Sequence, residues 1–264
     1  MKKIIKSILS ISFSVYLIIG VFLYIGQNNF LYFPTKKTAN AYKEKIFTNE
    51  NESISVTVLN LGEEKAIIYF GGNAENVDNN ANSFSEIFKD YTVYLVNYRG
   101  YGKSTGKPTE QGLYSDALHI YDSISNKYLK ISTIGRSLGT GIATYLASKR
   151  EIDKLALITP FDSVQSVAQE RFPIYPMSLL LKDKYKSIDR VNKIKAQTLI
   201  LMAQNDQIIK KKHTENLVNK FPPLQITVKV IKNENHNSIS NNELYYTFLK
   251  KYFKNTNKIY ENTI

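Results

Sequence analysis

The 264-residue sequence contains no cysteine, which excludes disulfides, thiolate zinc sites and a cysteine nucleophile. Tryptophan is also absent, and the 12 glycines and seven prolines are too few for a collagen-like or wholly disordered chain. There is no G-x-G-x-x-G dinucleotide motif, no H-E-x-x-H and no other clustered pattern of metal ligands. The phosphate-binding loop is incomplete as well, because Asn97 takes the place of its first glycine before Gly102-Lys103-Ser104. We therefore expect neither a metal ion nor an organic cofactor.

Arginine is scarce in a chain whose formal net charge is +12. Only five of its 35 basic residues are Arg, which binds phosphate groups with better-defined geometry than Lys does. The basic residues form pairs and one triplet, Lys210–Lys212, but no long block of like charge. This pattern favours a solvated basic face, or a surface held near anionic lipid, over a nucleic-acid partner.

The longest uncharged stretch, residues 7–35, follows Lys2, Lys3 and Lys6, and its first twenty residues, 7–26, are apolar. Twenty helical residues span roughly 30 Å, the thickness of a bilayer's hydrocarbon core. A cleaved signal peptide has a shorter apolar run and small residues before the cut, and Tyr24 is too bulky for that position. We predict an uncleaved transmembrane anchor over residues 1–29, with a signal peptide and a buried core helix as alternatives. The lysines before and after this stretch are nearly equal in number, and large domains can translocate regardless of such charges, so we expect an extracytoplasmic catalytic domain.

The rest of the chain alternates short apolar runs with amphipathic stretches, which indicates an α/β fold with a mostly parallel sheet. The first two predicted strands are joined by a turn at Gly62-Glu63-Glu64, and we expect them to form an antiparallel hairpin. One catalytic domain is predicted over residues 30–264. Its expected strands are 53–61, 65–70, 92–98, 130–135, 154–159, 198–203 and 226–231. Its expected helices lie near 76–88, 110–127, 138–149, 211–220 and 239–253.

The motif GRSLG (135–139) follows a predicted strand and precedes a predicted helix. G-x-S-x-G in this setting is typical of a nucleophile elbow, in which a strained turn exposes the serine hydroxyl and small residues allow close packing. Ser137 is therefore the predicted nucleophile. The alternative is an ordinary serine in a packing turn.

A serine nucleophile needs a base and an acid, and only three histidines are available. His236 is the one that directly follows a predicted strand, whereas His119 and His213 fall within predicted helices and are expected at the surface. Asp206 follows the preceding strand and is the predicted acid, with Asp162 as the alternative. The order serine, aspartate, histidine differs from both common protease orders and matches that of α/β-hydrolases.

The turn Gly71-Gly72 ends another predicted strand. A Gly-Gly turn leaves backbone N–H groups free to point at a bound oxygen. We expect those of Asn73 and Leu138 to form an oxyanion hole with Ser137. The alternative is a tight turn that uses glycine for backbone freedom alone.

Several spaced motifs from about Phe30 to Phe253 resemble those of membrane-anchored serine hydrolases of the α/β-hydrolase-domain type. In chain order they are QNNFLYFP, YFGGNAENV, VNYRGYGKSTGKPTEQGLYSDA, GRSLGTGIA, TPFDSV, FPIYP, AQND and NENH. The resemblance implies an eight-stranded α/β-hydrolase fold, with helices flanking the sheet and a transmembrane helix before it. It also implies catalytic roles for Ser137, Asp206 and His236 and an oxyanion hole at Asn73 and Leu138. The chain departs from the family at two places. Gly71-Gly72 stands where the family often has His-Gly, and Ala203-Gln204 stands where the family often has His-Gly shortly before the acid.

Residues 160–197 form the only long insertion between predicted strands and contain the apolar side chains of Phe161, Tyr175 and Met177. We name this insertion the cap segment and expect these three residues to contact substrate. The alternative is a helix that merely packs on the sheet.

Together these features predict a membrane-anchored hydrolase of carboxylic esters or thioesters with acyl, lipid-like substrates. A serine peptidase shares every motif, and a non-catalytic binding module is the third alternative. The acyl length, the leaving group and the oligomeric state stay open.

Overall fold

A computed structural model describes residues 1–36 and 41–254, and in these ranges the chain forms an eight-stranded sheet in the order β1-β2-β4-β3-β5-β6-β7-β8. β2 pairs antiparallel with β1 and β4, and all other neighbouring pairs are parallel. The expectation of a mostly parallel sheet is confirmed. The strands are β1 (Lys43–Asn49), β2 (Glu52–Leu59), β3 (Lys65–Phe70), β4 (Thr92–Val96), β5 (Lys130–Arg136), β6 (Lys154–Ile158), β7 (Gln197–Ala203) and β8 (Ile226–Ile231).

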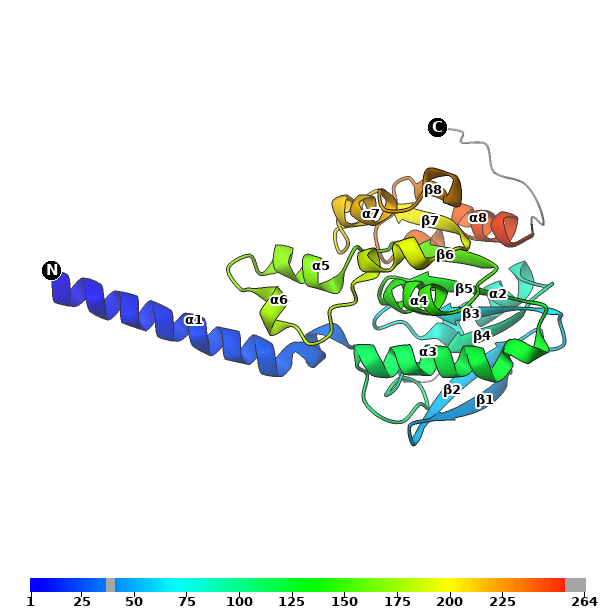
Figure 1. Cartoon of the computed structure of the whole chain (residues 1–264), viewed down its shortest axis with the longest axis horizontal. Helices are drawn as coiled ribbons and strands as arrows, with labels where there is room; N and C mark the ends of the chain where they lie inside the picture. Colours follow the sequence, from blue (N-terminus) through cyan, green and yellow to red (C-terminus); the bar gives the residue numbers. More distant parts are fainter. Residues whose placement is uncertain (37–40, 255–264) are drawn as a thin grey trace.

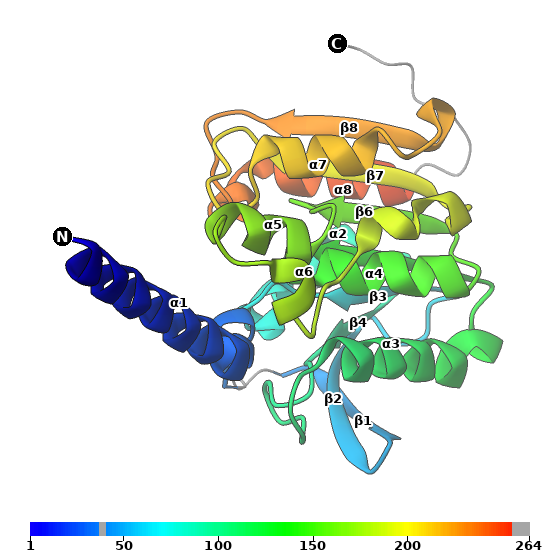
Figure 2. The ribbon, with the colours of Figure 1, turned by 60° about the vertical axis from the view of Figure 1, so that its left-hand side comes forward.

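Helices cover both faces of the sheet, with α3, α4 and α7 on one side and α2 and α8 on the other (Figure 2). The α-helices are α1 (Lys2–Leu31), α2 (Ala81–Ile87), α3 (Glu110–Ile124), α4 (Leu138–Lys149), α5 (Val164–Arg171), α6 (Met177–Leu180), α7 (Lys211–Val218) and α8 (Glu243–Lys254). Short 3₁₀ helices are η1 (Val77–Asn80), η2 (Ser125–Lys127), η3 (Ser187–Asp189), η4 (Val191–Lys193), η5 (Pro223–Gln225) and η6 (Ile239–Asn241).

The central strand β3 shows why the sheet is covered on both sides. Ala66, Ile68 and Phe70 pack into the core beneath α3 and α4. Ile67 and Tyr69 point to the opposite face and pack beneath α2 and α8. A strand that is apolar at every position can bury both faces only between two helical layers.

The expected hairpin between the first two predicted strands is wrong. β4 lies between β2 and β3, and β2 instead forms a hairpin with β1. Glu50 and Asn51, both with positive φ, make its two-residue turn. The segment from Leu59 to Lys65 is long enough to pass the roughly 10 Å between alternate strands. β1 was not predicted because its first three residues are charged, as is common for a strand at a sheet edge.

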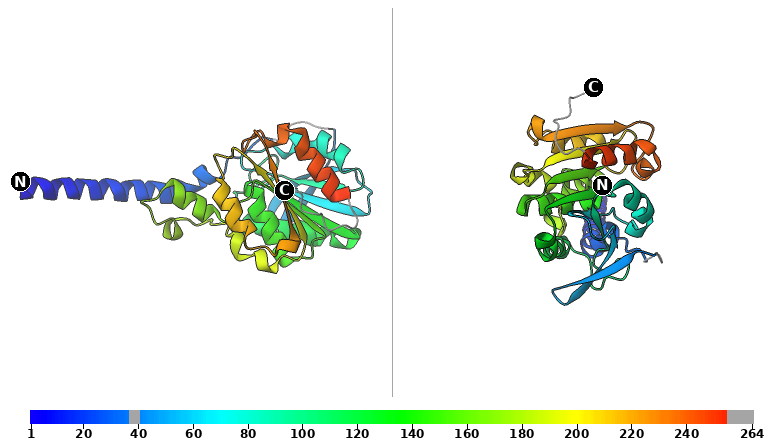
Figure 3. Two further views of the ribbon diagram at one scale, coloured as in Figure 1. Left: turned by 90° about the horizontal axis from the view of Figure 1, so that it is seen from above. Right: turned by 90° about the vertical axis from the view of Figure 1, so that its right-hand side faces the viewer.

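The apolar helix α1 extends away from the sheet, and α5 and α6 project in the same direction (Figures 1 and 3). Within the described ranges it is the one helix long and apolar enough to cross a membrane, and none of its most apolar stretch is buried inside the protein. Gln27 is its buried residue. The helix therefore presents its apolar side chains to its surroundings rather than to the core.

Candidate active site

Ser137 occupies a sharp turn between β5 and α4. Its φ of 48° and ψ of −115° place it in a region that side-chain-bearing residues rarely adopt, and its N–H donates to the carbonyl of Ile158 at 2.9 Å. The flanking glycines make this turn possible: a Cβ on Gly139 would overlap the carbonyl of Phe70, and one on Gly135 would overlap the backbone of Gly139. The local geometry is that of a nucleophile elbow.

Ser137, His236 and Asp206 form one hydrogen-bonded line at the carboxyl ends of β5, β8 and β7. The Ser137 Oγ lies 2.8 Å from His236 Nε2, and His236 Nδ1 lies 2.8 Å from Asp206 Oδ2. The other oxygen of Asp206 accepts the N–H groups of Ile208 and Ile209, which holds the carboxylate toward the ring. With Nδ1–H directed at a carboxylate, Nε2 is left to accept the serine proton.

The other two histidines lie elsewhere. His213 is buried, contrary to the expectation of a surface position, because it lies on the inner face of α7. Its Nδ1 is 3.0 Å from Asp162 and its Nε2 is 2.8 Å from Glu170. Asp162, the alternative acid, thus pairs with a different histidine. His119 is half-buried on α3.

The loop after β3 lies against the nucleophile. A Cβ on Gly72 would be 3.6 Å from the Cβ of Ser137, and Asn73 lines the same pocket as Ser137. Leu138 is the first residue of α4, and the first N–H groups of a helix have no partner within the helix. The two predicted oxyanion donors therefore belong to segments that meet at Ser137.

The carboxylate of Glu75 holds this loop in place. It accepts hydrogen bonds from the Gly72 N–H at 2.6 Å, the Tyr69 hydroxyl at 2.6 Å and the Asn80 amide at 2.7 Å. Arg136 adds an ion pair at 3.6 Å. Burial, and then the Glu75 charge, raise the pKa of the Tyr69 phenol well above its usual range, so it stays a donor. Burial disfavours the charge on Arg136, but Glu75, Tyr69 and Tyr245 together outweigh this effect and raise the pKa of its guanidinium.

Sequence reasoning did not single out Glu75 or Arg136. The available signal was an acidic residue just after a Gly-Gly turn and a basic residue beside the serine. The structure also accounts for the glycine at position 71, where the family often has histidine. A Cβ there would lie 2.6 Å from a methyl group of Val77, so a side chain does not fit without rearrangement.

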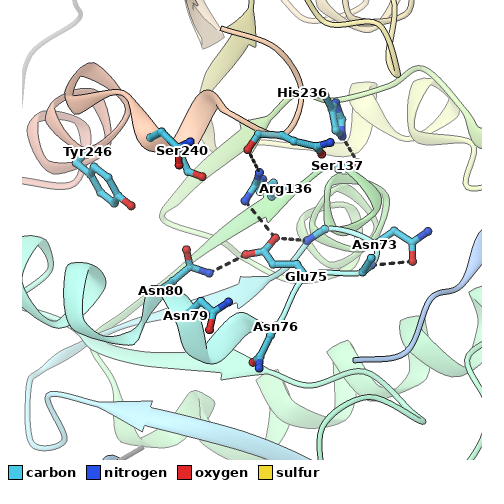
Figure 4. A pocket seen from close by; sticks show the side chains of 14 residues that line it. Asn73, Glu75, Asn76, Asn79, Asn80, Arg136, Ser137, His236, Ser240 and Tyr246 are labelled. Carbon is cyan, nitrogen blue, oxygen red and sulfur yellow. Dashed lines mark hydrogen bonds and ion pairs between the residues drawn. The ribbon is translucent and has the colours of Figure 1, made fainter. Parts of the chain in front are cut away.

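A pocket of about 440 Å³ opens beside Ser137 and His236 (Figure 4). Its remaining walls are predominantly polar and come from the loop after β3, from η1, from the end of β5, from the segment around η6 and from α8. They include Asn73, Glu75, Asn76, Asn79, Asn80, Arg136, Asn237, Ser240, Asn241 and Tyr246. A group rich in hydrogen-bonding atoms suits this space better than an alkyl chain.

The three predicted substrate contacts do not line this pocket. Phe161 is buried in the core beside Gly141. Tyr175 stacks on Tyr16 of α1, with ring centroids 4.7 Å apart. Met177 is 3% exposed, and its N–H donates to the side chain of Gln169. Within the described residues the structure therefore does not bring these three together at the serine.

Comparison with known proteins agrees with the fold. Residues 65–180 match the family model of the α/β-hydrolase fold. An esterase of Pyrococcus furiosus has a similar structure, with a TM-score of 0.65 and 19% identity over 84% of this chain and 98% of that chain. The chain therefore has the α/β-hydrolase fold.

Curated relatives match parts of the chain. An uncharacterized protein of Mycobacterium tuberculosis is 36% identical over 131 residues, 48% of this chain and 47% of that protein. The lysophosphatidylserine lipase of Xenopus tropicalis is 32% identical over 143 residues, 45% of this chain and 36% of that protein. The match thus spans about half the length of the first relative and less of the second.

Proposed function

We propose that this α/β-hydrolase-domain protein is a serine hydrolase that cleaves carboxylic esters or thioesters through an acyl-enzyme. The observation that carries the proposal is the line from Ser137 through His236 to Asp206, with both hydrogen bonds at 2.8 Å. A hydroxyl paired with an imidazole that is oriented by a carboxylate is the arrangement that activates serine for acyl transfer.

In the first half-reaction, His236 Nε2 takes the Ser137 proton while Oγ bonds to the acyl carbon. The carbonyl oxygen becomes an oxyanion held by the N–H groups of Asn73 and Leu138. Such donors are each worth on the order of 10²–10³ in rate. The acyl–leaving-group bond then breaks, and His236 returns the proton to the departing alcohol or thiol.

In the second half-reaction, a water molecule replaces the leaving group. His236 takes a proton from this water as its oxygen bonds to the acyl carbon. The bond to Ser137 breaks, the serine regains a proton from His236, and the carboxylic acid leaves. Asp206 stabilises the imidazolium that forms in each half.

The pocket supports a polar leaving group. Arg136, with its guanidinium held charged by Glu75, and the amides of Asn79 and Asn241 line the space beside Ser137. A relative, the lysophosphatidylserine lipase, acts by name on a lipid with a charged headgroup. We therefore infer a lipid-like acyl ester with a polar headgroup as the substrate class.

We also propose that residues 1–29 anchor the protein in a membrane as a single span, with the catalytic domain of residues 30–264 on the extracytoplasmic side. The length and apolar exposure of α1 support the anchor. The helices α5 and α6 of the cap segment, residues 160–197, project on the same side as α1 (Figure 1). That placement brings the catalytic domain next to the lipid surface.

Fluorophosphonate labelling of the full chain in detergent tests the activity. We expect stoichiometric labelling that disappears in Ser137→Ala and slows by orders of magnitude in His236→Ala. A panel of esters, thioesters and peptides with graded acyl length then separates an acyl hydrolase from a peptidase. Labelling that survives Ser137→Ala, or turnover of peptides alone, contradicts the proposal.

A further inference from the structure

The cap segment contacts one face of the apolar helix α1. Tyr16 stacks on Tyr175 with its ring nearly parallel, and its hydroxyl donates to the carbonyl of Ile174 at 3.0 Å. Eleven residues later, Gln27 donates to the carbonyl of Leu180 at 3.2 Å and accepts the N–H of Lys182 at 2.7 Å. These contacts follow about 16 Å of the helix axis, close to the thickness of one hydrocarbon leaflet.

Residues 172–181, which we name the cap loop, contain no charged side chain. Arg171 and Lys182 bound the loop, and the ammonium group of Lys182 lies over the ring of Tyr24 at 4.7 Å. Ile174 is 70% exposed and Leu179 is 79% exposed. An uncharged apolar loop between two cations matches a lipid interior bounded by headgroups better than it matches water.

Nearly all backbone polar groups of residues 172–177, the first part of the cap loop, are paired within the protein. The side-chain amide of Gln169 donates to the carbonyls of residues 172, 173 and 175, at 3.4, 3.3 and 3.0 Å. Tyr16 supplies the donor for residue 174, and the N–H of Tyr175 donates to residue 172. Proline at 173 and 176 removes two further N–H groups. Lipid tolerates non-helical backbone only where its polar groups are paired in this way.

We propose that the cap loop is a membrane-inserted surface, and that Ile174 and Leu179 lie among the acyl chains of the same leaflet as the adjoining half of α1. The proposal rests on the anchor proposed above, because the loop follows the helix. Figures 1 and 3 show α5, α6 and α1 leaving the catalytic domain on one side. A lipid surface, rather than a second protein, is the occupant because α1 exposes apolar side chains around the same contacts.

The absence of cysteine makes a direct test simple. Single variants Ile174→Cys, Leu179→Cys, Phe22→Cys and Leu224→Cys of the full chain carry a nitroxide label in phosphatidylcholine–phosphatidylglycerol vesicles. Phe22 is an exposed residue of α1 and serves as the membrane reference. Leu224, 82% exposed in η5 just before β8, serves as the water reference. Circular dichroism confirms that each variant is folded.

The readout is the ratio of collision rates with oxygen, which concentrates in lipid, and with a water-soluble nickel chelate. We expect the ratio at 174 and 179 to approach that at 22 and to exceed that at 224 several-fold. A lipid ratio at 22 with a water ratio at 174 and 179 overturns the cap-loop proposal alone. Water ratios at all three positions overturn the anchor as well, and labels shielded from both reagents identify a protein partner and overturn the proposal. None of these outcomes depends on hydrolase activity.

Discussion

The backbone N–H of Phe33 donates to the side-chain oxygen of Asn73 at 2.9 Å. Phe33 is the second residue after α1, and Asn73 lies in the loop that flanks Ser137. The Thr35 hydroxyl also donates to the carbonyl of Glu75 at 3.3 Å. The exit of the apolar helix is therefore bound to the loop that we propose holds the oxyanion, so the position of the helix and the geometry of the site depend on each other.

Replacement of the Asn73 side chain is expected to lower turnover without removing the backbone donor. Asn73→Ala deletes the acceptor shared by the Phe33 N–H and the Tyr101 hydroxyl, so the loop loses one of its ties to the segment after α1 and keeps the one from Thr35. We expect kcat to fall about tenfold, less than the loss of an oxyanion donor itself. Steady-state kinetics on a soluble ester measure this, with Tyr101→Phe as the milder control. An unchanged kcat would show that the tie has no catalytic role.

Glu75→Gln is expected to weaken the contacts that hold the same loop in place. The substituted amide cannot neutralise Arg136, and its NH₂ group faces one of the donors that the carboxylate accepted. A buried donor left without a partner costs about 1–3 kcal/mol. We expect a loss of unfolding free energy of that size together with slower fluorophosphonate labelling.

The matched control for Glu75 is Glu63→Gln, an exposed acidic residue in the turn after β2. Both variants remove one negative charge, so a general effect of net charge appears in both. Equal labelling rates in the two variants would contradict the positioning role of Glu75.

The sequence allowed much of the sheet to be predicted, because strands buried on both faces are apolar at nearly every position. β3 and β8 were predicted to the residue, and the others to within about two residues. The charged edge strand β1 does not show this pattern. The place of β4 between β2 and β3 depends on pairings distant along the chain, which local patterns do not encode.

The site is predictable where a reactive residue directly follows a strand, because Ser137, Asp206 and His236 each come just after a predicted strand. Their catalytic roles stay predictions until labelling tests them. Glu75 was missed because its role depends on Tyr69 and on neighbours contributed by other elements. The burial of His213 depends on which face of α7 meets the cap segment, and a short polar helix does not reveal that face.

The buried ion pair of Arg99 with Asp116 is expected to be essential for stability. Two guanidinium nitrogens donate to the Asp116 carboxylate at 2.7 and 2.9 Å and join the loop after β4 to α3. Removal of one partner leaves a buried charge, which costs about 3–5 kcal/mol. Arg99→Met should lower the free energy of unfolding in denaturant by that amount. Arg99→Met combined with Asp116→Leu should recover part of it, and a double variant less stable than the single one would contradict this account.

Stability should decline in acid through Glu170, which links α5 to α7. Hydrogen bonds from Lys210, Lys212 and His213 lower the pKa of this carboxyl to about 2 from its ordinary value of 4.5. Because the folded-state pKa is depressed, the contribution of Glu170 is complete above about pH 4.5 and is lost as the pH falls toward 2. Glu170→Gln should therefore be less stable than the wild type at pH 6, and the gap should narrow by pH 3. Urea unfolding of the full chain in micelles at pH 6 and pH 3 measures this difference in unfolding free energy.

The control for Glu170 combines Glu170→Gln with Lys210→Met and Lys212→Met, and compares this variant with the two lysine substitutions alone. In that background the difference in unfolding free energy should change less between pH 6 and pH 3. A difference that stays constant from pH 6 to pH 3 in the original pair would show that these cations do not hold the carboxylate in its charged form.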